Sequence, residues 1–192
     1  MVSDVACQCG MVNACHDQTL SGLPEKNPIS QEVIHVRKTI IDPNYGQGLT
    51  ELQGSGVGEL IHSAGVIVDT GDVRFVYLSG RVATDDEAGT VEARQQIVGI
   101  GDIKQQTRQT LRNIQAALRA AGGDLDDIVR MRVYVVAPMT KDMFGQIHEA
   151  RAEFFHKEHY PASTLVVISG LARAGALIEI DTDAVISPPA SS

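Results

Sequence analysis

The chain has 192 residues, of which 43% are hydrophobic and 21% are charged. A chain of this length can bury one sizeable core and has little room for a second full domain, so we expect a single domain at residues 31–192. The net charge of −8 argues against a nucleic-acid backbone or an anionic membrane as the main partner, because both require a basic patch.

Targeting signals are not evident in the sequence. No apolar run reaches the roughly 18 residues that would span a bilayer. The N-terminus lacks a basic segment followed by an apolar segment, which a secretion signal would need. A cytoplasmic location is therefore the default expectation.

The cysteines Cys7, Cys9 and Cys15 all lie near the N-terminus, and His16 follows the last of them. Such a group could bind zinc or act in redox chemistry, although structural zinc sites usually take two separated pairs of ligands from two elements. The alternative is reduced thiols on a mobile tail, because the segment shows no sustained apolar period. We expect residues 1–30 to form a flexible extension and to hold no metal.

The first half of the domain reads as strands. Residues 33–41 predict a short strand, which the turn-forming run at 42–48 ends. Residues 62–68 and 73–80 predict a β-hairpin, because the residues between them, Asp69, Thr70, Gly71 and Asp72, favour a tight turn.

Two helices are predicted. The first begins at Asp102, whose carboxylate can cap it with Gln105 completing a capping box, and ends at Gly122 and Gly123. Its apolar stripe is formed by Ile103, Thr107, Leu111, Ile114 and Leu118. The second helix begins at Thr140 and ends before Tyr160 and Pro161. It carries Phe144, Ile147, Arg151 and Phe154 along one side.

The remaining segments predict three strands. Residues 129–135 alternate between apolar Val129, Met131, Val133 and Val135 and the larger polar side chains between them, and residues 164–169 and 176–186 follow. This order predicts an α+β fold, a mixed sheet with both helices on one face. The other face, with Arg81 and Glu179, would be bare in a lone subunit, and such surfaces are normally covered by oligomerisation.

The final strand, residues 176–186, has two different faces. Ile178, Ile180, Ala184 and Ile186 would face the core, whereas Glu179, Asp181 and Asp183 would lie on the opposite side. A carboxylate on an inner sheet face is costly unless it is paired or used in chemistry. Glu179 is therefore a candidate functional residue, with a solvated acidic face as the alternative.

Several segments, in this order, resemble the RidA family (the YjgF/YER057c/L-PSP superfamily) over about residues 60–186. They are Ser79-Gly80-Arg81, residues 106–114 and 121–123, residues 127–134, residues 153–155, Tyr160-Pro161-Ala162 and Ile178-Glu179-Ile180. The resemblance implies a chorismate-mutase-like fold, a homotrimer whose sheets close into a barrel, and clefts between subunits. It also implies hydrolysis of enamines or imines to a carbonyl compound and ammonia, without a metal or organic cofactor.

The resemblance also assigns site residues. Glu179 matches the family's water-positioning glutamate, and Ser79 and Gly80 match its Ser-Gly pair. Ser163 stands where the family has a substrate-binding arginine, so the chain is a divergent member.

Other assignments are looser. Arg81, in place of a glutamine, is expected to bind the substrate carboxylate instead. His148 and His62 align with the family's site asparagine and site tyrosine and could transfer protons, and Tyr134 is a further expected contact. The alternatives are a surface ion pair for Arg81, an exposed helix position for His148 and a strand position for His62.

The sequence therefore predicts a metal-independent hydrolase that deaminates a small enamine or imine, with Glu179 as acid and base. Because the usual arginine is absent, an aminomuconate-type acid from aromatic breakdown is an attractive substrate. The alternative is a noncatalytic ligand-binding or chaperone-like trimer that kept the cleft. The acidic charge balance argues against ribonuclease activity.

Overall fold

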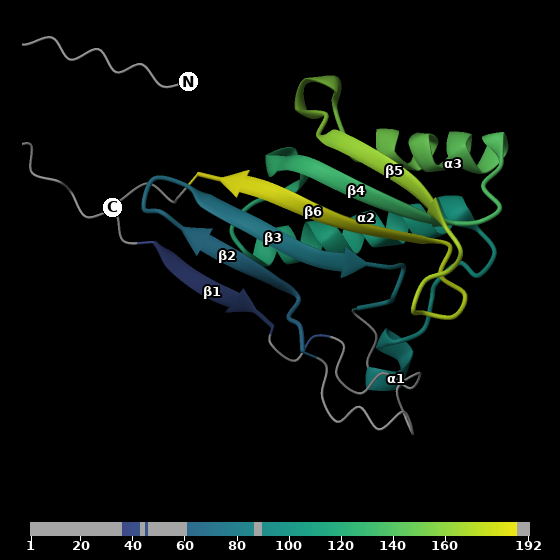
Figure 1. Ribbon diagram of the computed structural model, residues 1–192, viewed down its shortest axis with the longest axis horizontal. Helices are drawn as coiled ribbons and strands as arrows, with labels where there is room; N and C mark the ends of the chain where they lie inside the picture. The colour runs from purple at the N-terminus through teal and green to yellow at the C-terminus, as the bar shows by residue number, and fades with distance from the viewer. Residues whose placement is uncertain (1–35, 43–44, 46–60, 87–89, 188–192) are drawn as a thin grey trace, which may run out of the picture. The chain divides into compact units, whose positions relative to one another are not determined.

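The computed structural model describes residues 36–42, 45, 61–86 and 90–187 (Figure 1). All of them belong to one unit, Ile34–Ser192. The expected extension, with Cys7, Cys9, Cys15 and His16, lies outside the described residues.

A six-stranded mixed sheet forms the framework. Its strands are β1 (Arg37–Ile41), β2 (Gly65–Asp69), β3 (Arg74–Arg81), β4 (Ile128–Val136), β5 (Ala162–Ile168) and β6 (Ile178–Ile186). They lie in the order β1-β2-β3-β6-β4-β5, and β4 and β5 are parallel while the other neighbours are antiparallel. The predicted mixed sheet is confirmed, and the strand that carries Glu179 lies between β3 and β4.

The two predicted helices are present as α2 (Ile103–Ala120) and α3 (Lys141–Ala152), together with a short α1 (Val91–Arg94) that the sequence analysis did not foresee. Asp102 caps α2 by accepting a hydrogen bond from the Gln105 amide at 2.9 Å. The second helix is shorter than predicted. After its last turn the chain buries Phe155 and forms a separate 3-10 turn at Lys157–His159.

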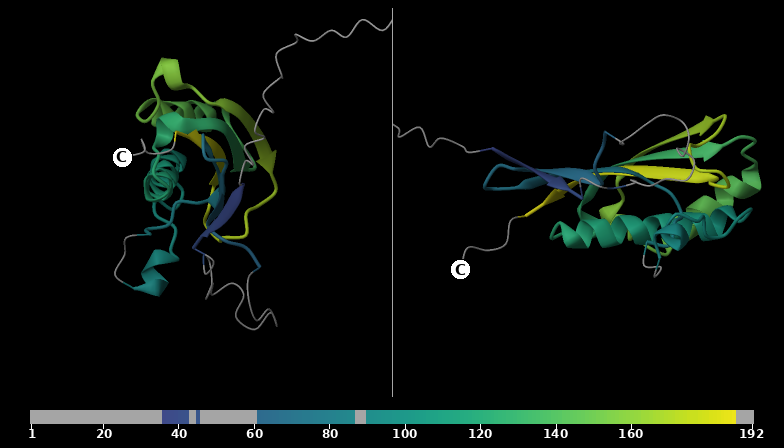
Figure 2. Two further views of the ribbon diagram at one scale, coloured as in Figure 1. Left: turned by 90° about the vertical axis from the view of Figure 1, so that its left-hand side faces the viewer. Right: turned by 90° about the horizontal axis from the view of Figure 1, so that it is seen from below.

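Helices α2 and α3 lie on the same side of the sheet, as Figure 2 shows. All five residues of the predicted stripe on α2 are buried. They pack against the inward residues of β3, β4 and β6, so burial of the apolar stripe holds the helix on the sheet. We call the opposite side, on which the described part of the chain places no helix, the open face.

Two irregularities in strand pairing overturn details of the prediction. Leu78 pairs with Thr182 but Arg81 pairs with Ile180, so β3 contains one extra residue at Ser79 and Gly80. Directly opposed residues share a face of the sheet, and Ile180 is buried in the core. The bulge therefore reverses the alternation and places Arg81 on the helix-covered face, not on the bare face as predicted.

A second irregularity lies between Ile128 and Arg130 on β4. It buries Ile128 and leaves Val129 half exposed, whereas the alternation predicted Val129 in the core. In both places one inserted residue decides which side chain faces inward. The alternation of apolar and polar residues in the sequence, which has a period of two, does not reveal such an insertion.

The open face carries apolar side chains that remain exposed among the described residues. Ile40, Val66 and Tyr77 stand side by side across β1, β2 and β3, and Ile40 and Tyr77 are 53% and 46% exposed. On the edge strand β5, Val166 is 42% exposed. Among the helices in the described part of the chain, none is long and apolar enough to cross a membrane.

Candidate active site on the open face of the sheet

Glu179 lies against the backbone of the neighbouring strand. Its half-buried side chain projects from β6 over Gly80 on β3, next to the bulge. A Cβ atom on Gly80 would lie 2.0 Å from Oε1 of Glu179, far inside van der Waals contact. The glycine thus makes room for the carboxyl group in the sheet.

The surroundings of Glu179 raise its affinity for a proton. Burial raises the pKa of its carboxyl group above the usual value, and the nearby negative charge of Asp181 raises it further. Within the described residues, no donor makes a hydrogen bond to this carboxylate that would lower the pKa again. A carboxyl group with a raised pKa can both accept and return a proton near neutral pH.

Tyr134 is the register partner of Glu179 on β4, so the two side chains share the open face. Its hydroxyl group donates a hydrogen bond of 3.2 Å to Oδ2 of Asp181. Burial and the adjacent Asp181 raise the pKa of Tyr134, so the phenol stays protonated and acts as a donor. Tyr134 was expected only as a substrate contact, and that role stays a prediction.

Arg132 connects two aspartates of β6. Its Nε donates to Oδ1 of Asp181, and Nη1 and Nη2 donate to the two carboxylate oxygens of Asp183 at 2.9 and 2.8 Å. The hydrogen bonds to Asp183 contribute most to a raised pKa of Arg132, and the hydrogen bond to Asp181 adds to it. Burial alone would lower this pKa. Both aspartates lie on the face predicted from the sequence, but the part of Arg132 was not predicted, because the pairing of β4 with β6 is not visible in the sequence.

Removal of the Arg132 charge should destabilise the fold. The guanidinium group is 34% exposed and its partners Asp181 and Asp183 are 18% and 24% exposed. Loss of one partner of a fully buried pair costs about 3–5 kcal/mol, and partial exposure reduces this, so we expect Arg132→Met to cost about 1–2 kcal/mol. Urea unfolding would measure the change.

The matched control adds two substitutions to the first. Asp181→Asn and Asp183→Asn in the Arg132→Met background remove the uncompensated charges, and we expect them to restore most of the lost free energy of unfolding. Equal stability of wild type and Arg132→Met would contradict a stabilising role for this bridge.

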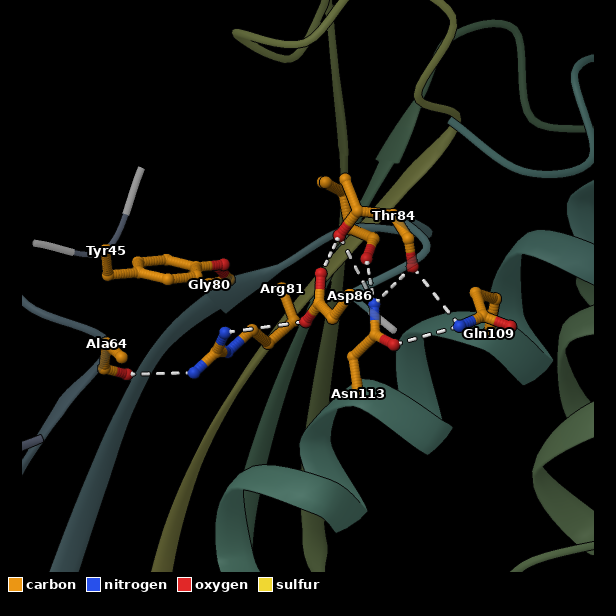
Figure 3. Close-up of polar contacts among 9 residues, drawn as sticks. Tyr45, Ala64, Gly80, Arg81, Thr84, Asp86, Gln109 and Asn113 are labelled. Atoms are coloured by element: carbon orange, nitrogen blue, oxygen red, sulfur yellow. Dashed lines mark hydrogen bonds and ion pairs between the residues drawn. The ribbon is translucent and has the colours of Figure 1, made fainter. Parts of the chain in front are cut away.

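Arg81 occupies a separate polar cluster on the helix side, shown in Figure 3. Its side chain is 7% exposed, donates from Nη2 to the Ala64 carbonyl oxygen at 3.4 Å, and lies with Nη1 3.9 Å from Oδ2 of Asp86. Asp86 in turn accepts a hydrogen bond from Thr84, whose carbonyl oxygen is bonded to Asn113 of α2. The structure therefore does not bring Arg81 and Glu179 together within one subunit.

Tyr45 covers this arginine, a contact that was not predicted from the sequence. The guanidinium carbon of Arg81 lies 4.1 Å from the centre of the Tyr45 ring, and the Tyr45 hydroxyl group donates to the Gly80 carbonyl oxygen at 3.4 Å. The exposed His62 packs edge-on against the same ring, with the centres of the two rings 5.9 Å apart. From the sequence, the run around Tyr45 predicts only a turn, because no periodic signal marks this residue.

The other predicted site residues are spread over the subunit. Ser79 donates from its hydroxyl group to the Ser63 carbonyl oxygen at 2.6 Å, next to the bulge. Ser163 is exposed on β5 opposite Met131, whose side chain lies in the core, so it belongs to the helix-side surface. His148 is exposed on α3 against Phe144, and burial lowers the pKa of its imidazole. Ser163 and His148 thus lie on the side of the sheet away from Glu179.

Gln106 of α2 anchors the loop that precedes Glu179. This fully buried side chain donates to the carbonyl oxygens of Gly99 and Gly175 at 3.1 and 2.9 Å and accepts from the Leu177 amide at 2.8 Å. Leu177 comes two residues before Glu179, so Gln106 fixes the start of β6. A polar residue inside the apolar stripe was the signal that could have identified it.

Comparison with known proteins places this chain in a family. The family model described as Endoribonuclease L-PSP matches residues 62–186. A RutC family protein of Pyrococcus horikoshii is 38% identical over 109 residues, 56% of this chain and 75% of that protein. The human 2-iminobutanoate/2-iminopropanoate deaminase is 29% identical over 127 residues, 66% of this chain and 81% of that protein.

Solved structures agree with the sequence matches. The crystal structure of TdcF from E. coli with bound serine has a TM-score of 0.51 and 29% identity, and the match covers 66% of this chain and 88% of that one. The chain belongs to the Endoribonuclease L-PSP family, the RidA (YjgF/YER057c) superfamily. The resemblance stated from the sequence is thereby confirmed.

Proposed function

We propose that the protein is a hydrolytic deaminase of small imines or enamines in which Glu179 activates water. The observation that carries the proposal is the half-buried Glu179 carboxyl group with its raised pKa, placed against Gly80 on the open face. A human relative named 2-iminobutanoate/2-iminopropanoate deaminase supports the reaction class. The structure of E. coli TdcF with bound serine supports a small-molecule site in this family.

The chemistry follows from one carboxyl group with two tasks. Ionised Glu179 takes a proton from water as the water oxygen attacks the carbon of a protonated imine, which forms a carbinolamine. The same group then gives the proton to the nitrogen. As the carbon–nitrogen bond breaks, the Glu179 carboxylate takes the proton of the carbinolamine hydroxyl group, so that ammonia leaves and the carbonyl forms. This last proton, which balances the proton of the starting iminium, then passes to ammonia or solvent. Imine and water are thus converted to a carbonyl compound and ammonia, and the scheme requires no metal or organic cofactor.

For the substrate we propose an aminomuconate-type acid, because it is a conjugated enamine that carries carboxylates. Arg81 was expected to bind such a carboxylate, and that role stays a prediction. Arg81 lies on the helix-covered face of its own subunit, so in this proposal it binds the carboxylate in a site that a neighbouring subunit completes. The same holds for His148 on α3.

We expect a homotrimer with sites between subunits. The uncovered apolar side chains on the open face, Ile40, Tyr77 and Val166, need a partner surface. Light scattering in dilute buffer should give about three times 20.6 kDa. A stable monomer would contradict this assembly.

A noncatalytic small-ligand-binding trimer is the second candidate function. Ser163 in the position of the family arginine favours it, because a serine cannot hold a carboxylate with two parallel hydrogen bonds. Such a protein would keep the cleft but not the turnover.

The deciding experiment measures ammonia and carbonyl product together on a panel of freshly generated imines and enamines, with and without carboxylates. Stoichiometric release of both products by wild type, above the spontaneous rate, supports the deaminase. Saturable binding of the carbonyl products without any acceleration would instead support the binding protein.

A further inference from the structure

Glu179 and Asp181 share one face of β6 but have opposite surroundings. They are two residues apart, so their side chains project to the same side of the sheet about 7 Å apart along the strand. Asp181 accepts hydrogen bonds from Arg132 and Tyr134. Within the described residues, Glu179 accepts none. One carboxyl group is therefore held in place and the other is free to react.

Two donors occupy both carboxylate oxygens of Asp181. The guanidinium group of Arg132 and the hydroxyl group of Tyr134 both need acceptor oxygens, which a carboxylate supplies. The two donors also fix the direction of the side chain. Asp181 thus presents a fixed negative charge at a defined distance from Glu179.

Arg132 does not cancel that charge, because it is shared. Its two Nη atoms bind Asp183 while Nε binds Asp181, so one positive charge serves two carboxylates. The other groups that face Glu179 across the sheet are neutral: Tyr134 on β4 and the Ser79–Gly80 bulge on β3, with Tyr77 further along β3 opposite Asp183. Arg130 lies opposite Asp183, at the far end of this row from Glu179, so the carboxylate of Asp181 is the nearest charge to Glu179 along β6.

We infer that Asp181 is a positioning residue of the site, whose fixed charge, held by Arg132 and Tyr134, sets the proton affinity of Glu179. The inference rests on the proposed function, because it assigns a task to a group that tunes the acid and base of that reaction. The same negative charge would favour the protonated imine, the form that water attacks. The raised pKa of Glu179, to which Asp181 contributes after burial, agrees with it.

The test compares Asp181→Asn with Asp183→Asn in the full-length protein. Both variants remove one negative charge from the Arg132 bridge, but Asp183 lies four residues from Glu179, about 13 Å along the strand. Carbon-13 NMR of labelled glutamate, with Glu179→Gln to assign the signal, would follow the titration of Glu179. The pKa of Glu179 should fall in both variants, and at least twice as far in Asp181→Asn, because the interaction weakens with distance.

A second matched pair of variants separates the effect of the Asp181 charge from any structural effect of replacing this residue. Asp181→Glu keeps the charge and Asp181→Gln removes it, so the pKa of Glu179 should stay raised in the first and fall in the second. In activity, the low-pH limb of kcat/KM should move to lower pH in Asp181→Asn and keep its place in Asp181→Glu.

Equal shifts in Asp181→Asn and Asp183→Asn, or no shift in either, would overturn the inference. The NMR titration does not need turnover, so it remains decisive even if the protein hydrolyses no imine. A titration that follows the prediction together with an absence of ammonia release would sink the proposed function and leave the electrostatic role of Asp181 in place.

Discussion

Glu179→Gln is expected to lower the rate of imine hydrolysis by about 10² or more, the usual scale for loss of a positioned acid or base. Glutamine keeps the shape of the side chain over Gly80 but cannot take a proton from water or return it to nitrogen. Initial rates of ammonia release at saturating imine would measure the loss. An unchanged kcat would remove Glu179 from the mechanism.

The same variant should be more stable than wild type at neutral pH. The pKa of Glu179 is raised in the folded protein by burial and by Asp181, so its ionisation costs folding free energy as the pH rises through that pKa. Below about pH 4, where the carboxyl group is protonated in both folded and unfolded states, the two proteins should be equally stable. Thermal unfolding of both proteins across this pH range should show that the stability advantage of the variant increases as the pH rises. An advantage that increases toward low pH would contradict the prediction.

Gly80→Ala should lower turnover by a similar factor, about 10², although it changes no ionisable group. The new Cβ atom would lie 2.0 Å from Oε1 of Glu179, so the carboxyl group has to move. A displacement of about 1 Å at a reacting group can cost about 10² in rate. Because the obstacle is the end of a flexible side chain, the fold should survive, and kcat should fall while the thermal midpoint changes little.

Gly145→Ala is the matched control. Gly145 lies within α3, and a Cβ atom there would meet nothing within 4 Å. We expect unchanged turnover and a gain of about 0.5–1 kcal/mol in stability, because alanine is the better helix former. If both substitutions left kcat unchanged, the close approach of Glu179 to Gly80 would have no part in the reaction.

The charge pattern on the open face also bears on substrate choice. Asp181 and Asp183 compete for the single cation of Arg132, and Arg81 is buried on the other face. Within one subunit the described residues thus leave no arginine free beside Glu179. A carboxylate on the substrate would depend on a neighbouring subunit, which links the substrate proposal to the trimer.

The sequence by itself determined the elements with strong periods and clear ends. The α2 stripe from Ile103 to Leu118 and the Asp102 cap lie where predicted, because helical spacing and a capping side chain are local properties. The alternation in β6 likewise put Glu179, Asp181 and Asp183 on one face. The order of strands and helices was enough to predict a mixed sheet with one covered side.

Only the tertiary structure decided which polar residues meet. The bulge at Ser79 and Gly80 moved Arg81 to the helix side, and the pairing of β4 with β6 brought Arg132 and Tyr134 to the acidic residues. Neither follows from the sequence pattern. No change in residue type along the strand marks a bulge, yet beyond the bulge the side chains that faced the core face the other side. Contacts between strands that lie far apart in the chain depend on register, which is set by packing of the whole sheet.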